Sequence, residues 1–188
     1  MTVKIRMQTG CGEMILALEE KAAPQTVQAF LDYLGAGAYA DTTFFRIVNE
    51  THPQAGAAAK INVVQGGPRF DTSGHDPALQ LFDMPHEPTS MTGLKHCHGA
   101  IAMGRFAPGE SYGGFYICNG DQPELDAGGA RFPDGLGGAV FGQVVEGFET
   151  LSKIAEHAGE SEFTDRPVPI HSIVVIRSFR QTVPSGAP

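Results

Sequence analysis

The 188-residue chain has few cysteines, no long apolar run and no cluster of basic residues. Cys11, Cys97 and Cys118 are odd in number and widely spaced, which argues against a disulfide framework or a CxxC metal knuckle. We expect them to be reduced thiols, as in cytosolic proteins. No apolar run approaches the roughly 20 residues that span a bilayer, and the N-terminal segment alternates instead of forming a signal-peptide core. These absences predict a soluble, cytoplasmic protein.

Positive charge is scarce as well. Lys and Arg number 13 against 21 Asp and Glu, giving a formal net charge of −8. The scattered cations argue against partners such as nucleic acids or anionic membranes. Apolar residues at 41% and charged residues at 18% indicate a globular rather than a disordered chain. Without an internal repeat or linker, residues 1–188 are predicted to form a single domain, with 180–188 as a frayed tail.

The 24 glycines and 13 prolines are spread along the chain and favour many short elements separated by turns. Two segments have helical periodicity, and the others alternate as strands do. Strands this dispersed do not form βαβ units, so we predict a mainly β fold: a closed eight-stranded antiparallel barrel capped by two α-helices. Residues 68–95 form a connection long enough to be functional or family-specific. The predicted strands are 3–8, 13–19, 42–48, 61–65, 99–103, 114–118, 139–145 and 170–179, and the predicted helices are 24–35 and 148–158.

One arginine stands within the strand-like run YADTTFFRIV at 39–48. Period-two alternation predicts that Phe44, Arg46 and Val48 share a face, although Phe44 suits the barrel core better than a groove. A cation among apolar groups is costly unless it is used. An apolar wall beside a rigid five-donor fork would suit a ring next to a carbonyl, as in a prolyl peptide. The alternative is an ion pair between Arg46 and a surface carboxylate such as Asp41.

Five segments in order carry a resemblance to a known family. The chain resembles cyclophilins, the barrel-type peptidyl-prolyl cis-trans isomerases, and is most similar to short bacterial members. This resemblance implies an eight-stranded barrel with two capping helices, no cofactor and a proline groove on the outside of the barrel. The segments are GEMILALEEKAAPQTVQAFLDYLGAGAYADTTFFRIV, VVQGG, HEPTSMTGLKHCHGAIAMGR, GGFYICNGDQPELD and AVFGQVVEGFETLSKIA.

The resemblance also implies roles for individual residues. Arg46 matches the catalytic arginine. Gln65 matches the glutamine that hydrogen-bonds the substrate or the arginine, although it could instead cap the loop at Gly66. Tyr116 stands where the proline pocket usually has Phe, and its hydroxyl could reach water or add a hydrogen bond. The implied substrate-binding residues are Phe45, Val48, Asn62, Val63, Gln65, Gly104, Arg105, Gly114, Tyr116 and Leu125.

Several positions depart from the family pattern. Phe45, Asn62 and Gly114 replace residues that usually complete the groove, and Glu124 and Gly138 stand where some members have Trp and His. The expected function is still isomerisation of Xaa-Pro bonds that assists protein folding. The partners would be proline-containing segments of client proteins, bound by a monomer.

Two alternatives remain open. Because Phe45, Asn62 and Gly114 replace residues that usually complete the groove, the barrel could be a proline-peptide binding or chaperone module without turnover. Alternatively, His96 and His98 form an HxH pair whose imidazoles share one face of an extended segment, as in cupin-like metal barrels. Glu110 and either His157 or His171 would have to complete that metal site.

Overall fold

The computed structural model describes residues 3–52, 54, 57–68, 85–106, 108 and 113–176. The predicted tail at 180–188 and most of the 68–95 connection therefore lie outside the described residues. The elements are β1 (Val3–Thr9), β2 (Gly12–Leu18), α1 (Pro24–Gly35), β3 (Thr43–Val48), β4 (Val63–Gly67), α2 (Thr89–Thr92), β5 (Ala100–Met103), β6 (Phe115–Cys118), the short 3-10 helix η2 (Pro123–Leu125), β7 (Ala139–Glu146), α3 (Phe148–Ala155) and β8 (Phe163–Ile176).

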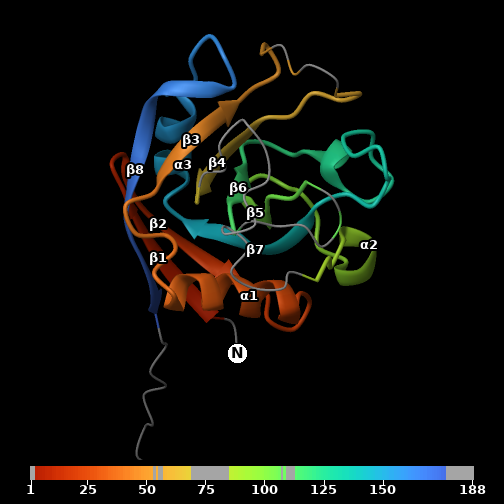
Figure 1. The fold of residues 1–188 in the computed structure, drawn as a ribbon, viewed down its shortest axis with the longest axis horizontal. Helices are drawn as coiled ribbons and strands as arrows, with labels where there is room; N and C mark the ends of the chain where they lie inside the picture. Colours follow the sequence, from red (N-terminus) through yellow and green to blue (C-terminus); the bar gives the residue numbers. More distant parts are fainter. Residues whose placement is uncertain are drawn as a thin grey trace, which may run out of the picture.

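The strands close into a barrel in the order β1-β2-β7-β5-β6-β4-β3-β8. Every pairing is antiparallel, including the β1–β2 hairpin and the β1–β8 pairing that closes the ring. Figure 1 shows α1 below the strands and α3 on another side of the barrel. The predicted eight-stranded barrel with two capping helices is thus confirmed, and the described residues add the short helix α2. None of the described helices is long and apolar enough to cross a membrane.

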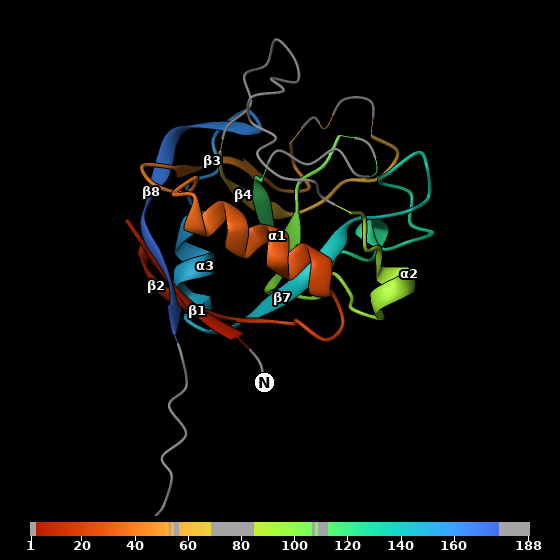
Figure 2. The ribbon, with the colours of Figure 1, turned by 60° about the horizontal axis from the view of Figure 1, so that its bottom comes forward.

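The inside of the barrel is filled by aromatic and aliphatic side chains from both strands and helices. Phe30 of α1 lies 5.1 Å from the ring of Phe141 and 6.1 Å from that of Phe115, and Figure 2 shows α1 lying across the barrel near β7. Phe44 packs edge-on against Phe115 at 5.9 Å and is fully buried, so it belongs to the core as expected. Leu151 and Ile154 of α3 join the same cluster, and their burial helps to stabilise the fold.

A second apolar cluster lies on the opposite face of five neighbouring strands, β3 to β7 in the barrel order. Along β4, Val64 belongs to the inner cluster and Val63 to the second, as strand alternation requires. This outer cluster positions the candidate site. Its buried members are Val48, Ile61, Val63, Ala100, Ala102, Tyr116, Cys118, Leu125 and Val140.

A β-bulge in β3 corrects the predicted alternation. The register of β3 with both β4 and β8 shifts between Phe44 and Arg46, so Phe45 is the additional residue. Phe44 consequently faces the barrel interior, while Arg46 lines the outer pocket and Val48 joins the outer cluster. The prediction that these three side chains share one face was wrong for Phe44.

The boundaries of β8, α3 and β4 also differ from those expected. Strand β8 begins at Phe163, seven positions before the predicted start, and runs through Pro167 and Pro169. Proline is generally unfavourable within a strand, but β8 pairs with β3 in its first half and with β1 in its second. Helix α3 ends at Ala155 rather than near Ala158. Strand β4 begins at Val63 because the backbone of Ile61 is hydrogen-bonded by the Gln54 side chain.

Candidate active site

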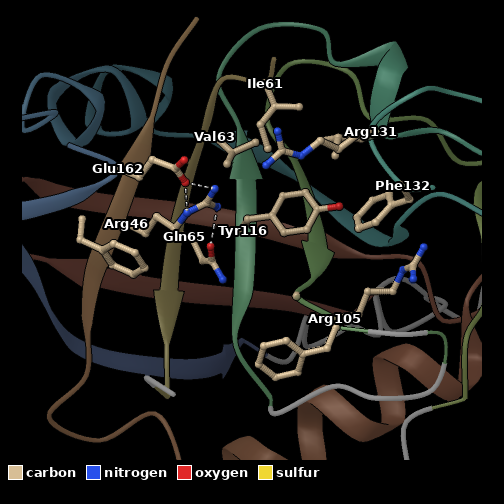
Figure 3. A pocket seen from close by; sticks show the side chains of 13 residues that line it. Arg46, Ile61, Val63, Gln65, Arg105, Tyr116, Arg131, Phe132 and Glu162 are labelled. Carbon is tan, nitrogen blue, oxygen red and sulfur yellow. Dashed lines mark hydrogen bonds and ion pairs between the residues drawn. The ribbon is translucent and has the colours of Figure 1, made fainter. Parts of the chain in front are cut away.

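A cavity of about 290 Å³ opens on the outer face of β3, β4 and β6 (Figure 3). Apolar clefts with a few placed polar groups are the usual form of small-ligand and peptide sites. Seven of the residues expected from the sequence line it: Arg46, Val63, Gln65, Gly104, Arg105, Tyr116 and Leu125. Its other lining residues are Ile61, Phe106, Arg131, Phe132, Glu162 and Phe163.

Arg46 is held by two partners from different parts of the chain. Its Nε donates to Glu162 Oε2 at 2.9 Å, its Nη2 pairs with the same oxygen, and its Nη1 donates to Gln65 Oε1 at 2.9 Å. Gln65 stands opposite Arg46 in the β3–β4 pairing, and Glu162 immediately precedes β8. The ion pair is therefore with Glu162 and not with Asp41, which occupies the exposed turn before β3. Two anchors restrict the direction of the guanidinium at the pocket edge.

The apolar side of the pocket is formed by Val63, Leu125 and the ring of Tyr116. All three are buried in the outer cluster. In Figure 3 the Tyr116 ring lies in the middle of the pocket, with Val63 and Ile61 on one side and Phe132 on the other. An apolar slot with a fixed cation beside it is the arrangement that the sequence pattern suggested.

The hydroxyl of Tyr116 is tied into the protein. Its oxygen lies 2.9 Å from His96 Nε2, and His96 Nδ1 lies 2.8 Å from Asp126 Oδ1. Because a carboxylate accepts, Nδ1 carries the proton and the Tyr116 hydroxyl donates to Nε2. Burial raises the pKa of Tyr116 well above its usual value and keeps the phenol protonated. Of the two possibilities that the sequence left open, water contact or an added hydrogen bond, the hydroxyl makes a hydrogen bond, and its partner lies within the protein.

Gly138 makes room for this hydrogen bond. A Cβ at position 138 would overlap the Tyr116 hydroxyl and would lie 2.8 Å from His96 Nε2. Two departures from the family pattern, Tyr at 116 and Gly at 138, are thus coupled in space.

Arg105 forms one wall of the pocket and is neutralised there. Its Nη1 and Nη2 donate to the two carboxylate oxygens of Asp134 at 2.8 and 3.0 Å, and its Nε donates to the carbonyl of Gly137 at 3.0 Å. The hydrogen bonds from Arg105 lower the pKa of the Asp134 carboxyl to about 2. The guanidinium also lies 4.0 Å from the centre of the Phe132 ring, so it supports that ring through a cation–π contact.

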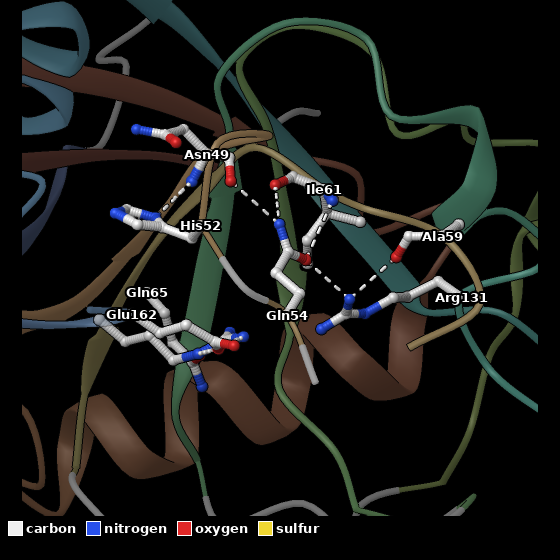
Figure 4. Close-up of polar contacts among 9 residues, drawn as sticks. Asn49, His52, Gln54, Ala59, Ile61, Gln65, Arg131 and Glu162 are labelled. Atoms are coloured by element: carbon white, nitrogen blue, oxygen red, sulfur yellow. Dashed lines mark hydrogen bonds and ion pairs between the residues drawn. The ribbon is translucent and has the colours of Figure 1, made fainter. Parts of the chain in front are cut away.

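Arg131 was not identified from the sequence. It lies in the turn-rich segment between η2 and β7, and its Nη1 donates to Gln54 Oε1 at 2.7 Å and to the carbonyl of Ala59 at 3.0 Å (Figure 4). Two loops, before β4 and before β7, therefore meet at the edge of the pocket. Arg131 and Glu162, which precedes β8, both lie in loops without a periodic pattern, so no local signal pointed to either residue.

Four of the expected substrate-binding residues do not line the cavity. Phe45 is buried and stacks on Phe163 at 6.4 Å, and Val48 is fully buried beneath the pocket. The backbone N–H of Asn62 donates to Gln122 Oε1 at 2.8 Å, and Gly114 accepts a hydrogen bond from the Gly104 N–H. Their placement supports the pocket from behind or beside it.

The histidines do not converge. His96 binds Tyr116 and Asp126, whereas His98 stacks on Phe148 and accepts a hydrogen bond from the Gly120 N–H. His157 contacts Cys11 Sγ at 3.7 Å. No group of three or more His, Cys, Asp or Glu side chains suited to a metal occurs in the described part of the chain. Glu110, which the metal alternative needed, lies outside it.

The fold and the site define a class of protein: a closed antiparallel barrel with an apolar pocket and an anchored arginine on its outer face. The family model of cyclophilin type peptidyl-prolyl cis-trans isomerases matches residues 3–176. The chain belongs to this family, as its sequence motifs predicted. The comparisons support neither the cupin-like alternative nor the binding-only one.

Two curated relatives show the extent of the similarity. Peptidyl-prolyl cis-trans isomerase A of Dickeya dadantii is 31% identical over 172 residues, covering 91% of this chain and 80% of the relative. Peptidyl-prolyl cis-trans isomerase B of Escherichia coli is 28% identical over 174 residues, covering 91% of this chain and 95% of the relative. The similarity therefore spans nearly the whole of this chain and most of each relative.

Solved structures show the same fold. A cyclophilin type peptidyl-prolyl cis-trans isomerase from Cryptosporidium parvum superposes with a TM-score of 0.70 at 20% identity, covering 94% of this chain and 99% of the other. The same protein, crystallised in the presence of the dipeptide Ala-Pro, superposes with a TM-score of 0.68.

Proposed function

We propose that this chain is a peptidyl-prolyl cis-trans isomerase that acts on Xaa-Pro bonds in unfolded or flexible protein segments, and so assists folding. The observation that carries the proposal is the anchored guanidinium of Arg46 at the edge of the apolar slot made by Val63, Leu125 and Tyr116. Membership of the cyclophilin type family supports it. The three cysteines are free thiols, which favours a reducing, cytoplasmic setting. The barrel closes within one chain around a single main core, in keeping with a single-domain monomer.

The chemistry requires no nucleophile, because no bond to the substrate forms. Rotation about the prolyl amide faces a barrier of roughly 20 kcal/mol that arises from amide resonance. As the bond twists, resonance is lost and the nitrogen becomes pyramidal and basic. A cation held at that point stabilises the twisted amide more than either planar form, and this difference accelerates the step.

The residues of the pocket divide this task. Val63, Leu125 and Tyr116 would hold the proline ring, while Arg46 would interact with the amide nitrogen or the neighbouring carbonyl. Glu162 and Gln65 would act as positioning residues by restricting the direction of the Arg46 guanidinium. Positioning matters because a catalytic donor loses effect when it is misaligned.

Substitution of Arg46 tests the proposal. NMR exchange spectroscopy on a capped Ala-Pro peptide should show faster cis-trans exchange with catalytic amounts of the native protein. Arg46→Ala should lower kcat/KM by about 10²-fold or more, as the loss of a transition-state donor does. Arg46→Lys keeps the charge but not the fork, and it should lie between the two.

Circular dichroism and the urea midpoint should show that the variants remain folded. Unchanged exchange with a folded Arg46→Ala protein would disprove the assignment. Peptide line broadening without faster exchange, seen with the native protein, would show that the pocket binds proline peptides without turning them over.

A further inference from the structure

Three arginines line the pocket, and they differ in how their charge is balanced. Arg46 is paired with Glu162, and Arg105 is paired with both oxygens of Asp134. Arg131 forms no ion pair with any residue in the part of the chain that the structure describes. Among the described residues, the pocket lining therefore carries one positive charge without an ion-pair partner, in a protein whose net charge is −8.

Neutral groups fix the Arg131 guanidinium in place. Both of its hydrogen-bond acceptors, Gln54 Oε1 and the carbonyl of Ala59, are uncharged. Gln54 is only 7% exposed and is itself fixed, because its Nε2 donates to the Ile61 carbonyl at 2.9 Å and its Oε1 accepts from the Ile61 N–H at 3.1 Å. In Figure 3 the Arg131 side chain extends toward Val63 and Tyr116. The positive charge of Arg131 is thus held at the pocket by the buried side chain of Gln54.

The electrostatic setting favours an anion. Burial lowers the pKa of Arg131, and the Arg46 guanidinium lowers it further, while Glu162 partly opposes both effects. A guanidinium nevertheless stays protonated in proteins. Arg46 and Arg131 repel one another across the cavity, and Glu162 is already hydrogen-bonded to Arg46. A negative group on the ligand would reduce this repulsion.

We propose that Arg131 is a specificity-determining residue, which favours prolyl substrates that carry an anionic side chain, a carboxylate or a phosphate, next to the proline. This inference rests on the proposed function. The cavity of about 290 Å³ contains both the apolar slot and Arg131, so a group that reaches Arg131 while the ring fills the slot must belong to an adjacent residue. A partly exposed charge pair predicts a preference of about two- to fivefold.

The test uses capped peptides, so that the ligand has no terminal charges. Peptides with Glu or Gln immediately before or immediately after the proline are compared by NMR exchange spectroscopy, and kcat/KM is measured for each. For the native protein, kcat/KM for Glu should exceed that for Gln by about two- to fivefold on at least one side of the proline. The Glu-to-Gln ratio should fall to about one in Arg131→Gln.

Arg6→Gln is the matched control. Arg6 lies on β1, which pairs with β2 and β8, whereas the pocket lies over β3, β4 and β6. This substitution removes the same charge from the other side of the barrel and should leave the Glu-to-Gln ratio unchanged. A phosphoserine and serine pair tests the second source of charge, and the larger of the two ratios identifies the preferred anion.

Two results would overturn the inference: a Glu-to-Gln ratio of one or less on both sides of the proline, or an unchanged ratio in a folded Arg131→Gln protein. If Arg131→Gln does not fold, Arg131→Lys and the native protein decide the question. The ratio should persist in part with lysine, and for the native protein it should shrink from 0.05 to about 0.5 M salt, because an ion pair is screened.

If the protein does not catalyse prolyl isomerisation at all, the same peptides give a different result. The neutral Gln peptide reports isomerisation without any anion, so an absence of faster exchange on that peptide would disprove the isomerase and not the charge preference. The dissociation constants of the Glu and Gln peptides, from chemical-shift titration of the labelled protein, would then test the preference by itself.

Discussion

At the scale of single residues, Gly138 and Tyr116 depend on one another. The Tyr116 hydroxyl occupies the space that a Cβ at position 138 would need, and it satisfies the buried His96 Nε2. A residue other than glycine would therefore have to displace either the tyrosine ring or the histidine. The pocket floor is shaped by this pair rather than by either position alone.

Gly138→Ala should destabilise the protein by about 1 to 3 kcal/mol, as overpacking of a filled site does. The cost should be smaller in the Tyr116→Phe background, because the overlapping oxygen is then absent. Tyr116→Phe alone should cost about 1 to 3 kcal/mol, since it leaves a buried histidine nitrogen without its partner. Urea unfolding of the native protein, both single variants and the double variant measures the coupling. Strictly additive losses would argue that the two positions act independently.

The same residues show what could be predicted from the sequence. The resemblance predicted that Arg46, Gln65 and Tyr116 would meet, and the cavity contains all three. Glu162 lies 116 positions from its partner Arg46, and Arg131 lies 77 positions from Gln54. Both lie in loops, where no periodic pattern reveals which side chains will meet. Contacts of this kind depend on how loops cross the barrel surface.

At the scale of elements, helix α1 depends on a distant carboxylate. Its N-cap, Ala23, has no side-chain acceptor, and the first N–H groups of a helix need one. Glu87 supplies it: Oε2 accepts from the Thr26 N–H at 2.7 Å and from the Thr26 hydroxyl at 2.6 Å, and Oε1 accepts from the Gln25 N–H at 3.3 Å. A negative group also complements the helix dipole at that end.

Glu87→Ala should therefore lower the free energy of unfolding by about 2 kcal/mol, because charge-assisted hydrogen bonds to buried donors are lost. Glu149→Ala is the matched control: Glu149 is an exposed acid in the first turn of α3, and its loss should cost about 0.5 kcal/mol. Both variants can be measured by urea denaturation. Equal losses in the two variants would mean that Glu87 acts as a general charge near a helix end and not as a cap.

Most elements followed from periodicity, and the failures have local causes. The β1–β2 hairpin, α1 and the central strands lie where alternation and the i, i+3, i+4 pattern predicted them. The bulge at Phe45 was missed because a single inserted residue does not change the composition of a strand. The early start of β8 was missed because Pro167 and Pro169 argue against a strand, whereas the exchange of partners from β3 to β1 tolerates them.

At the scale of the whole molecule, one set of strands has two tasks. Their inner faces and the helices form the main core, and the outer faces of β3 to β7 carry the cluster on which the pocket is built. Two loops complete the pocket from outside, through Arg131 and Glu162. The barrel can therefore stay rigid while changes in these loops alter charge and specificity, as is common for sites on stable scaffolds.

Stability of the whole molecule should decrease in mild acid. Burial lowers the pKa of His96 below 6.5 despite the opposing effect of Asp126, and burial also lowers the pKa of His86. A histidine with a lowered pKa binds its proton more weakly in the fold than in the unfolded chain. Unfolding then takes up protons, so the free energy of unfolding falls as the pH drops below about 6.5, by at most about 1.4 kcal/mol per pH unit for each proton.

Asp126 extends the decrease to lower pH. Burial would raise its pKa, but hydrogen bonds from the side chain and backbone of His96 outweigh this effect and lower it below 3.8, so its stabilising contribution is lost as the carboxylate becomes protonated. Urea unfolding at intervals from pH 8 to 5 measures the upper part of the curve, and His96→Gln should flatten it. A slope identical to that of the native protein would show that His96 is not the group being protonated.

Because a protonated His96 would carry a proton on Nε2, it would oppose the hydrogen bond donated by Tyr116. Acid should therefore disturb the floor of the pocket before it unfolds the barrel, and the Tyr116 ring resonances should shift in NMR spectra at a higher pH than the unfolding midpoint.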